Sequence, residues 1–226
     1  SKMLATTGYA TLAISTRQHD QLINTDNFFD IPKDIGAAVH VLKTLGYKRI
    51  VLYGHSLGNI HEIYYEAVTR DPAVKAVVVT GMFANLPWKS RNILIRNETN
   101  YNLLYKYALE YVRAGRANDI LPVKMGYTMG TTSPVSAIHF LTYRSTETSV
   151  AIGTYWIRYV PVPILMVRDE GDMIVLPFEP YWLLGNATAP GSMVPSAKFV
   201  LLPNPKGPNP NGHGFEDNKQ QLFDTI

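Results

Sequence analysis

The sequence predicts an α/β fold, with a mostly parallel, doubly wound sheet covered by helices on both faces. Five short apolar runs lack the alternation of polar and apolar residues that marks half-exposed strands, and such runs are typical of strands buried in a parallel sheet. Helical patterns lie between the first runs, which favours right-handed crossovers. The chain has 226 residues, of which 46% are hydrophobic, enough for one globular domain with a sizeable core.

The predicted strands span residues 10–14, 50–53, 74–79, 164–167 and 199–202. Between the first two we expect a helix that Asp30 can cap, that has Pro32 in its first turn and that ends at Gly46. Its apolar stripe consists of Ile31, Ile35, Val39 and Leu42. A second helix is expected after the strand at 50–53, with an apolar stripe of Ile60, Ile63, Tyr64 and Ala67.

Residues 84–159 depart from this pattern and are predicted to form an inserted, mainly helical cap. The two parts of the core are then residues 1–83 and 160–226. Aromatic residues gather in the insertion, and such residues pack a core more often than they contact a substrate, so packing is the favoured interpretation. The group consists of Trp88, Tyr101, Tyr105, Tyr107, Tyr111 and Trp156.

The composition argues against several classes of protein. The net charge is only +3 and no basic run is interleaved with aromatic residues, so a nucleic-acid partner is not expected. The absence of cysteine removes disulfides, thiolate catalysis and cysteine-ligated metal sites. No segment reaches the roughly 18 apolar residues of a membrane-spanning helix. His61 and Glu62 begin a zinc-like pattern without its second histidine, so neither a metal nor a cofactor is expected.

The segment Gly54-His55-Ser56-Leu57-Gly58 directly follows a predicted strand and opens a predicted helix. A sharp turn there strains the backbone of Ser56, and the two glycines remove side chains that would collide across the bend. Such a turn exposes the serine at the carboxyl end of the sheet, where open α/β folds place their sites. A serine nucleophile needs a histidine that takes its proton and a carboxylate that orients the histidine.

Candidates for both partners follow the last two predicted strands. Asp172 comes shortly after residues 164–167, and His213 follows the last strand in an irregular loop. Asp169 lies closer to the strand end and stays an alternative acid, with Asp172 preferred. The remaining histidines flank the serine, lie on helices, follow the first strand or lie in the insertion: His55, His40, His61, His19 and His139.

With these residues the chain resembles the α/β-hydrolase family over nearly its whole length. "GHSLG" resembles the nucleophile elbow of that family, "PILMVRDEGDMIV" its acid segment and "GHGFED" its histidine segment. The resemblance implies Ser56 as nucleophile, His213 as general base and then acid, and Asp172 as the orienting carboxylate. It also implies that the backbone N–H of Leu57 donates to the oxyanion.

In the family, the second oxyanion donor comes from a loop after a strand that precedes the first strand predicted here. That strand lies between the strands represented by residues 10–14 and 50–53, and no such segment occurs in this sequence. Its absence would leave backbone groups unpaired on two strand edges, at about 1–3 kcal/mol for each buried group. We therefore expect further residues upstream of Ser1.

The predicted function is hydrolysis of a carboxylic ester of a small molecule through a Ser-His-Asp triad and an acyl-enzyme. The aromatic insertion favours an apolar or aromatic group in the substrate. Acyltransferases, thioesterases and carbon–carbon hydrolases use the same triad, and a non-catalytic ligand-binding receptor or scaffold is the alternative of another class. The low charged content, 17%, leans toward a secreted or periplasmic protein, while the compartment and the oligomeric state stay open.

Overall fold

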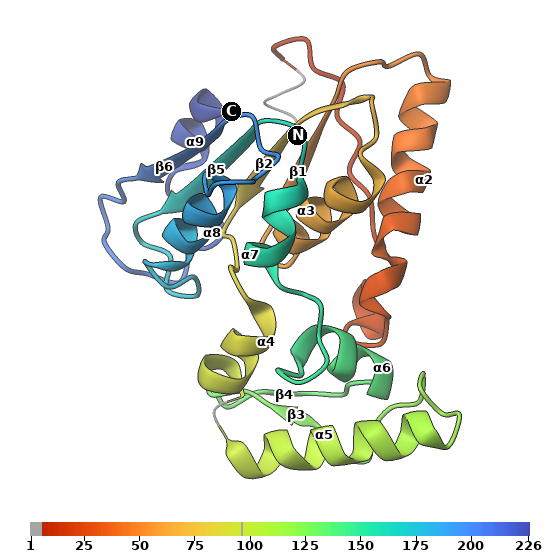
Figure 1. The fold of residues 1–226 in the computed structure, drawn as a ribbon. Coiled ribbons are helices and arrows are strands. Elements are labelled where there is room, and N and C mark those ends of the chain that lie inside the picture. The colour runs from red at the N-terminus through yellow and green to blue at the C-terminus, as the bar shows by residue number, and fades with distance from the viewer. Residues whose placement is uncertain (1–5, 96) are drawn as a thin grey trace. The chain divides into compact units, whose positions relative to one another are not determined.

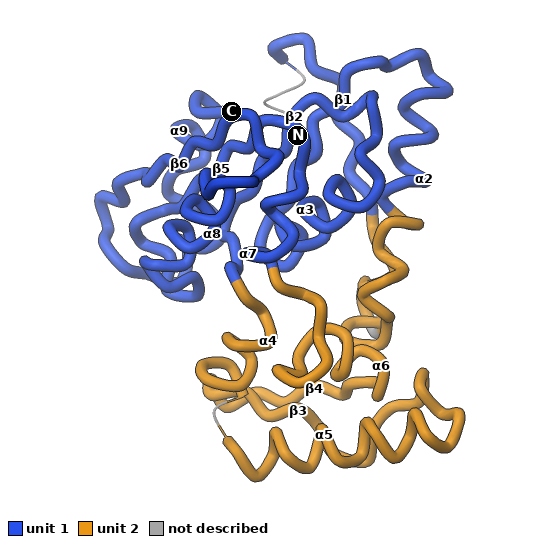
Figure 2. The backbone as a smooth tube through the Cα atoms, viewed as in Figure 1, with its two compact units in different colours: residues 1–14, 35–84, 153–226 blue, residues 15–34, 85–152 orange. Residues whose placement is uncertain are grey.

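The computed structural model describes residues 6–95 and 97–226. The chain divides into two compact units, which Figure 2 colours separately. Unit 1 comprises residues 1–14, 35–84 and 153–226, and unit 2 comprises residues 15–34 and 85–152. Within the described ranges, no helix is both long and apolar enough to cross a membrane.

Unit 1 contains a four-stranded parallel sheet in the order β1-β2-β5-β6 (Figure 1). This sheet confirms four of the five predicted strands and the predicted fold class. Because the strands are parallel, their carboxyl ends meet at one edge, which brings the segments that follow β1, β5 and β6 close together. The strands are β1 Ile50–His55, β2 Val74–Thr80, β5 Ile164–Asp169 and β6 Ala197–Leu202.

The strand predicted at residues 10–14 is wrong, because these residues have no regular secondary structure. Leu12 and Ile14 are 46% and 41% exposed, and the segment pairs with no strand among the described residues. An apolar run becomes a strand only where a neighbour accepts and donates its backbone hydrogen bonds. Among the described residues, strand β1 is accordingly an edge strand of the sheet, as is β6.

The helix α2, Ile31–Thr44, confirms the first predicted helix. The cap predicted at Asp30 is wrong, because a 3-10 turn, η2 (Phe28–Asp30), runs directly into α2. Asn27 caps that turn instead, and its side chain accepts a hydrogen bond from the backbone N–H of Phe29. Three residues of the predicted apolar stripe are buried: Ile31, Ile35 and Val39.

The second predicted helix is confirmed as α3, Gly58–Thr69, which packs against β1 and β2. Its predicted apolar residues, Ile60, Ile63, Tyr64 and Ala67, are all buried. The other helical segments of unit 1 are α7 Gly153–Trp156, η5 Ile157–Tyr159, α8 Glu179–Ala187 and α9 Lys219–Thr225.

Unit 2 has a separate core. Tyr101 of its longest helix, α5, is buried, and its ring centroid lies 5.4 Å from that of Phe140, which supports packing as the role of this tyrosine. Whether residues 84–159 act as a cap stays a prediction. The segments of unit 2 are η1 Asp20–Leu22, η2, α4 Leu86–Lys89, η3 Ser90–Leu94, α5 Glu98–Arg113, β3 Met125–Gly126, β4 Thr132–Ser133, α6 Ala137–His139 and η4 Phe140–Arg144.

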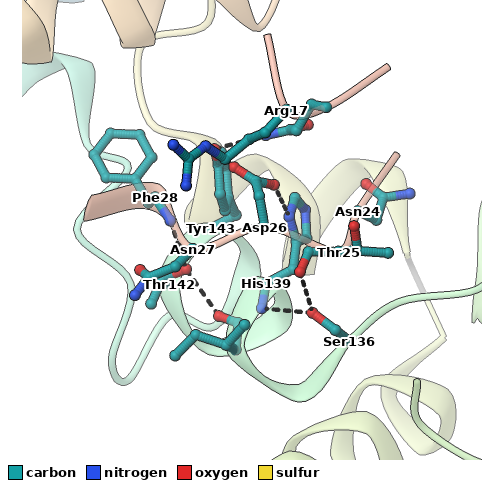
Figure 3. A network of polar contacts seen from close by, with 12 residues as sticks. Arg17, Asn24, Thr25, Asp26, Asn27, Phe28, Ser136, His139, Thr142 and Tyr143 are labelled. Carbon is teal, nitrogen blue, oxygen red and sulfur yellow. Dashed lines mark hydrogen bonds and ion pairs between the residues drawn. The ribbon is translucent and has the colours of Figure 1, made fainter. Parts of the chain in front are cut away.

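A buried polar network binds residues 15–34 to the remainder of unit 2 (Figure 3). The carboxylate of Asp26 contacts Nδ1 of His139 at 3.0 Å and accepts a hydrogen bond from the Tyr143 hydroxyl at 2.6 Å. The backbone N–H of Phe28 donates to the hydroxyl of Thr142 at 3.2 Å. These contacts, and not an apolar stripe alone, explain why the segment before α2 belongs to unit 2.

Candidate active site

Ser56 lies between β1 and α3 in a turn whose backbone is strained. Its φ is +55°, a left-handed conformation that is uncommon for residues other than glycine and that costs free energy. The backbone N–H of Ser56 donates to the carbonyl oxygen of Thr80 at 2.9 Å, which ties the turn to the end of β2. The side-chain amide and the backbone N–H of Asn59 donate to the Ser56 carbonyl.

The two glycines of this turn differ in their steric role. A β-carbon at Gly54 would lie 2.6 Å from the carbonyl oxygen of Gly58, a distance that real side chains essentially never show. A β-carbon at Gly58 would meet no atom within 4 Å. The expectation that both glycines avoid a collision is therefore wrong for Gly58, because only the position before the serine faces the backbone across the bend.

His213 lies between Ser56 and Asp172. Its Nε2 atom is 2.9 Å from the Oγ of Ser56, and its Nδ1 atom is 2.9 Å from Oδ2 of Asp172. An ionised carboxylate only accepts hydrogen bonds, so the neutral ring carries its proton on Nδ1 and presents the Nε2 lone pair to the serine hydroxyl. The three side chains thus form a continuous hydrogen-bonded chain.

Asp172 is buried, and both of its carboxylate oxygens have hydrogen-bond partners. Oδ1 accepts from the backbone N–H groups of Ile174 and Val175, at 2.7 and 3.0 Å, while Oδ2 faces His213. Burial raises the pKa of Asp172, but the hydrogen bonds from His213 and from the backbone lower it by more than burial raises it. The pKa of Asp172 therefore lies below its ordinary value. Asp172 therefore stays ionised at neutral pH.

Arg168, a residue that is not among the predicted site residues, shapes the loop that carries Asp172. Its guanidinium lies inside unit 1 and donates to the carbonyl oxygens of Asp172 and Val175, at 2.8 and 3.0 Å. No sequence motif marks this role, because the arginine acts on backbone atoms a few residues further along the chain. The alternative acid, Asp169, contacts other residues and not His213.

His55 flanks the serine but belongs to a different set of contacts. Its Nδ1 atom lies 3.0 Å from the hydroxyl of Thr80, and its ring centroid lies 5.0 Å from that of His213. Burial lowers the pKa of His55, and the neighbouring His213 lowers it further. His55 is thus a neutral neighbour of the hydrogen-bonded chain.

The backbone N–H of Leu57 makes no hydrogen bond to any residue that the structure describes. It can therefore donate a hydrogen bond to a group beside Ser56, and its role as a donor to the oxyanion stays a prediction. The ring of Phe83 stacks near the imidazole of His213. Their centroids are 6.3 Å apart and the angle between the ring planes is 27°. Among the described residues, no group of three histidines or carboxylates is placed to hold a metal ion.

A protein-family model described as "Protein of unknown function (DUF1749)" matches residues 30–150. Est1E from Butyrivibrio proteoclasticus has a similar structure, with a TM-score of 0.57 and 17% sequence identity over 88% of this chain and 68% of that one. BpoC from Mycobacterium tuberculosis H37Rv gives a TM-score of 0.53 and 12% identity over 92% and 76%. No curated protein sequence matches the chain. At these identities, the likeness to the two solved structures concerns the fold.

Proposed function

The chain belongs to the DUF1749 family, and on this premise we propose that it is a serine hydrolase of the α/β-hydrolase superfamily that cleaves carboxylic esters. The observation that carries the proposal is the pair of 2.9 Å contacts that His213 makes, one with the hydroxyl of Ser56 and one with the carboxylate of Asp172. A half-buried imidazole held in this way can take the proton of the serine.

In the proposed reaction, Nε2 of His213 accepts the hydroxyl proton while Oγ of Ser56 attacks the acyl carbon of the ester. The N–H of Leu57 stabilises the oxyanion, and His213 then protonates the leaving alcohol. A water molecule, deprotonated by His213, attacks the acyl-enzyme and releases the acid. Throughout, the carboxylate of Asp172 stabilises the imidazolium that forms.

An aromatic side chain beside the reacting groups supports an apolar or aromatic group in the substrate. Phe83 is buried with its ring stacked near that of His213, so an aromatic side chain lies one ring away from Ser56. We expect aryl esters to react faster than esters of the same reactivity that carry a charged group.

A fluorophosphonate probe tests this proposal, because it forms a covalent adduct only with an activated serine. We expect one adduct per chain by intact-protein mass spectrometry, none in Ser56→Ala, and a loss of more than about 10⁴-fold in kcat/KM for a nitrophenyl ester. Ser196→Ala, which removes the hydroxyl of an exposed serine, is the matched control. A folded wild-type protein that forms no adduct and hydrolyses no ester would instead favour a ligand-binding role.

A further inference from the structure

Asp169 ends strand β5 and is completely buried, yet it makes no contact with His213. Its carboxylate accepts three hydrogen bonds. Oδ1 accepts from the backbone N–H of Gly171 at 2.6 Å and from the side-chain amide of Asn204 at 2.9 Å. Oδ2 accepts from the side-chain amide of Asn218 at 2.8 Å.

These three donors come from different segments at the carboxyl edge of the sheet. Gly171 lies in the loop that carries Asp172, Asn204 follows β6, and Asn218 precedes α9. His213 lies in the loop between the two asparagines, residues 204–218, which we call the histidine loop. Asp172 lies in the loop between β5 and α8, residues 170–178, which we call the acid loop. One carboxylate thus binds both ends of the histidine loop and the start of the acid loop. Asn204 and Asn218 are themselves 7% and 2% exposed.

The acid and histidine loops also pack backbone against backbone. A β-carbon at Gly212 would lie 2.3 Å from the carbonyl carbon of Gly171, and the N–H of Asn209 donates to the carbonyl oxygen of Gly171 at 3.1 Å. Where two loops touch this closely, a shift at the ends of one changes the distance between the side chains they carry. Here those side chains are His213 and Asp172.

A buried carboxylate is stable only where its oxygens accept hydrogen bonds. Asp169 has no ion-pair partner in the part of the chain that the structure describes, so the three N–H donors provide its stabilisation. Replacing Oδ2 by an amide nitrogen would set two N–H donors against each other at Asn218. The contact would then be repulsive, and that end of the histidine loop would move.

We propose that Asp169 is a positioning residue that holds the histidine loop in register with the acid loop, so that His213 contacts Ser56 and Asp172 together. The inference rests on the proposed function for its effect on the reaction. Its structural part, the contact between His213 and Asp172, does not require turnover.

The test compares Asp169→Asn with the double variant Asp169→Asn/Asn218→Asp, in which the new carboxylate can accept from the new amide but no longer donates to the carbonyl oxygen of Pro203. The readouts are the rate of fluorophosphonate labelling and the downfield proton resonance of the His213 Nδ1–H held by Asp172. Asp224→Asn, the same change at an exposed site on α9, is the control. Circular dichroism shows whether each variant is folded.

We expect Asp169→Asn to label about 100-fold more slowly and to lose the downfield resonance, and the double variant to recover at least about tenfold of the rate. Equal labelling of Asp169→Asn and wild type overturns the proposal. If Asp169→Asn does not fold, Asn218→Ala replaces it, because this change keeps the carboxylate and removes one of its three donors, together with the hydrogen bond from Asn218 to the carbonyl oxygen of Pro203. Wild-type labelling and an unchanged resonance in that variant also overturn the proposal.

The two proposals fail in different ways. A wild-type protein that is not labelled contradicts the hydrolase function, and the resonance of His213 then decides the positioning role by itself. Loss of the resonance in Asp169→Asn and its return in the double variant support that role in either case. An unchanged resonance in Asp169→Asn contradicts the role, whatever the wild-type protein does with the probe.

Discussion

Gly81 lies directly against the imidazole ring of His213. A β-carbon at position 81 would lie 3.0 Å from Cε1 of His213 and 3.0 Å from Cε1 of His55. The φ of Gly81 is +53°, in the left-handed region that favours glycine. A side chain at this position would therefore require the imidazole rings of His213 and His55 to shift.

Gly81→Ala is expected to impair the site more than the fold. The new methyl group pushes the His213 ring away from Ser56, so we expect labelling by a fluorophosphonate to slow by about 100-fold. Alanine in this left-handed conformation should also lower the free energy of unfolding by about 1–2 kcal/mol, measured in urea. Gly185→Ala is the control, because that glycine lies in α8 with no atom close to its β-position, and alanine there stabilises the helix by about 0.5–1 kcal/mol. Labelling of Gly81→Ala at the wild-type rate would show that the ring tolerates the methyl group.

The elbow glycines provide a second pair of variants with opposite expectations. Gly54→Ala forces a β-carbon into the backbone at residue 58, so we expect it to lower the free energy of unfolding by more than about 2 kcal/mol or to prevent folding. Gly58→Ala meets open space at the first position of α3, where alanine favours the helix, so its stability should equal or exceed that of the wild type. Urea unfolding of both variants checks this. Equal destabilisation of the two variants would mean that a side chain at residue 58 also collides with its neighbours.

The sequence could predict those parts of the fold and of the site that depend on local patterns. The apolar runs of β1, β2, β5 and β6 and the stripes of α2 and α3 are such patterns. Ser56, Asp172 and His213 each follow a parallel strand, and parallel strands end at one edge, so their proximity follows from the strand pattern.

Other features depend on partners that no local pattern reveals. The run at residues 10–14 has the composition of a strand, but pairing needs a neighbour, and none lies beside it in the described ranges. Asp26 and His139 are 113 positions apart, and their contact is one of several that explain why residues 15–34 join unit 2. Gly81 follows β2 without any motif, and its closeness to His213 appears only in three dimensions.

Two glutamates of α3 should make the protein less stable as the pH rises. Burial raises the pKa of Glu62 to about 8 and that of Glu66 to about 7. The folded protein therefore keeps protons that the unfolded chain loses near its ordinary pKa of 4.5, so the free energy of unfolding falls as the pH rises from about 4.5 to 8. We expect Glu62→Gln to reduce this fall by on the order of 2 kcal/mol, measured by urea unfolding at several pH values.

Glu110→Gln is the control for the pH series, because Glu110 is exposed on α5. It should leave the pH dependence of the free energy of unfolding unchanged. If wild type and Glu62→Gln lose stability equally between pH 5 and 8, Glu62 does not hold a proton in the folded state.

His139 should make unit 2 less stable as the pH falls below about 6.5. Burial lowers its pKa from 6.5 to about 4, although Asp26 opposes the shift. Between about pH 6.5 and 4, His139 is therefore protonated in the unfolded chain but not in the folded unit. The free energy of unfolding of unit 2 falls as the pH drops through this range. At pH 5 the loss should be on the order of 2 kcal/mol, read from hydrogen-exchange protection factors of residues 137–144.

His139→Gln should remove this loss, whereas His40→Gln, at an exposed position of α2, should retain it. Protection that is independent of pH in the wild type would mean that His139 is already charged in the folded unit, paired with Asp26.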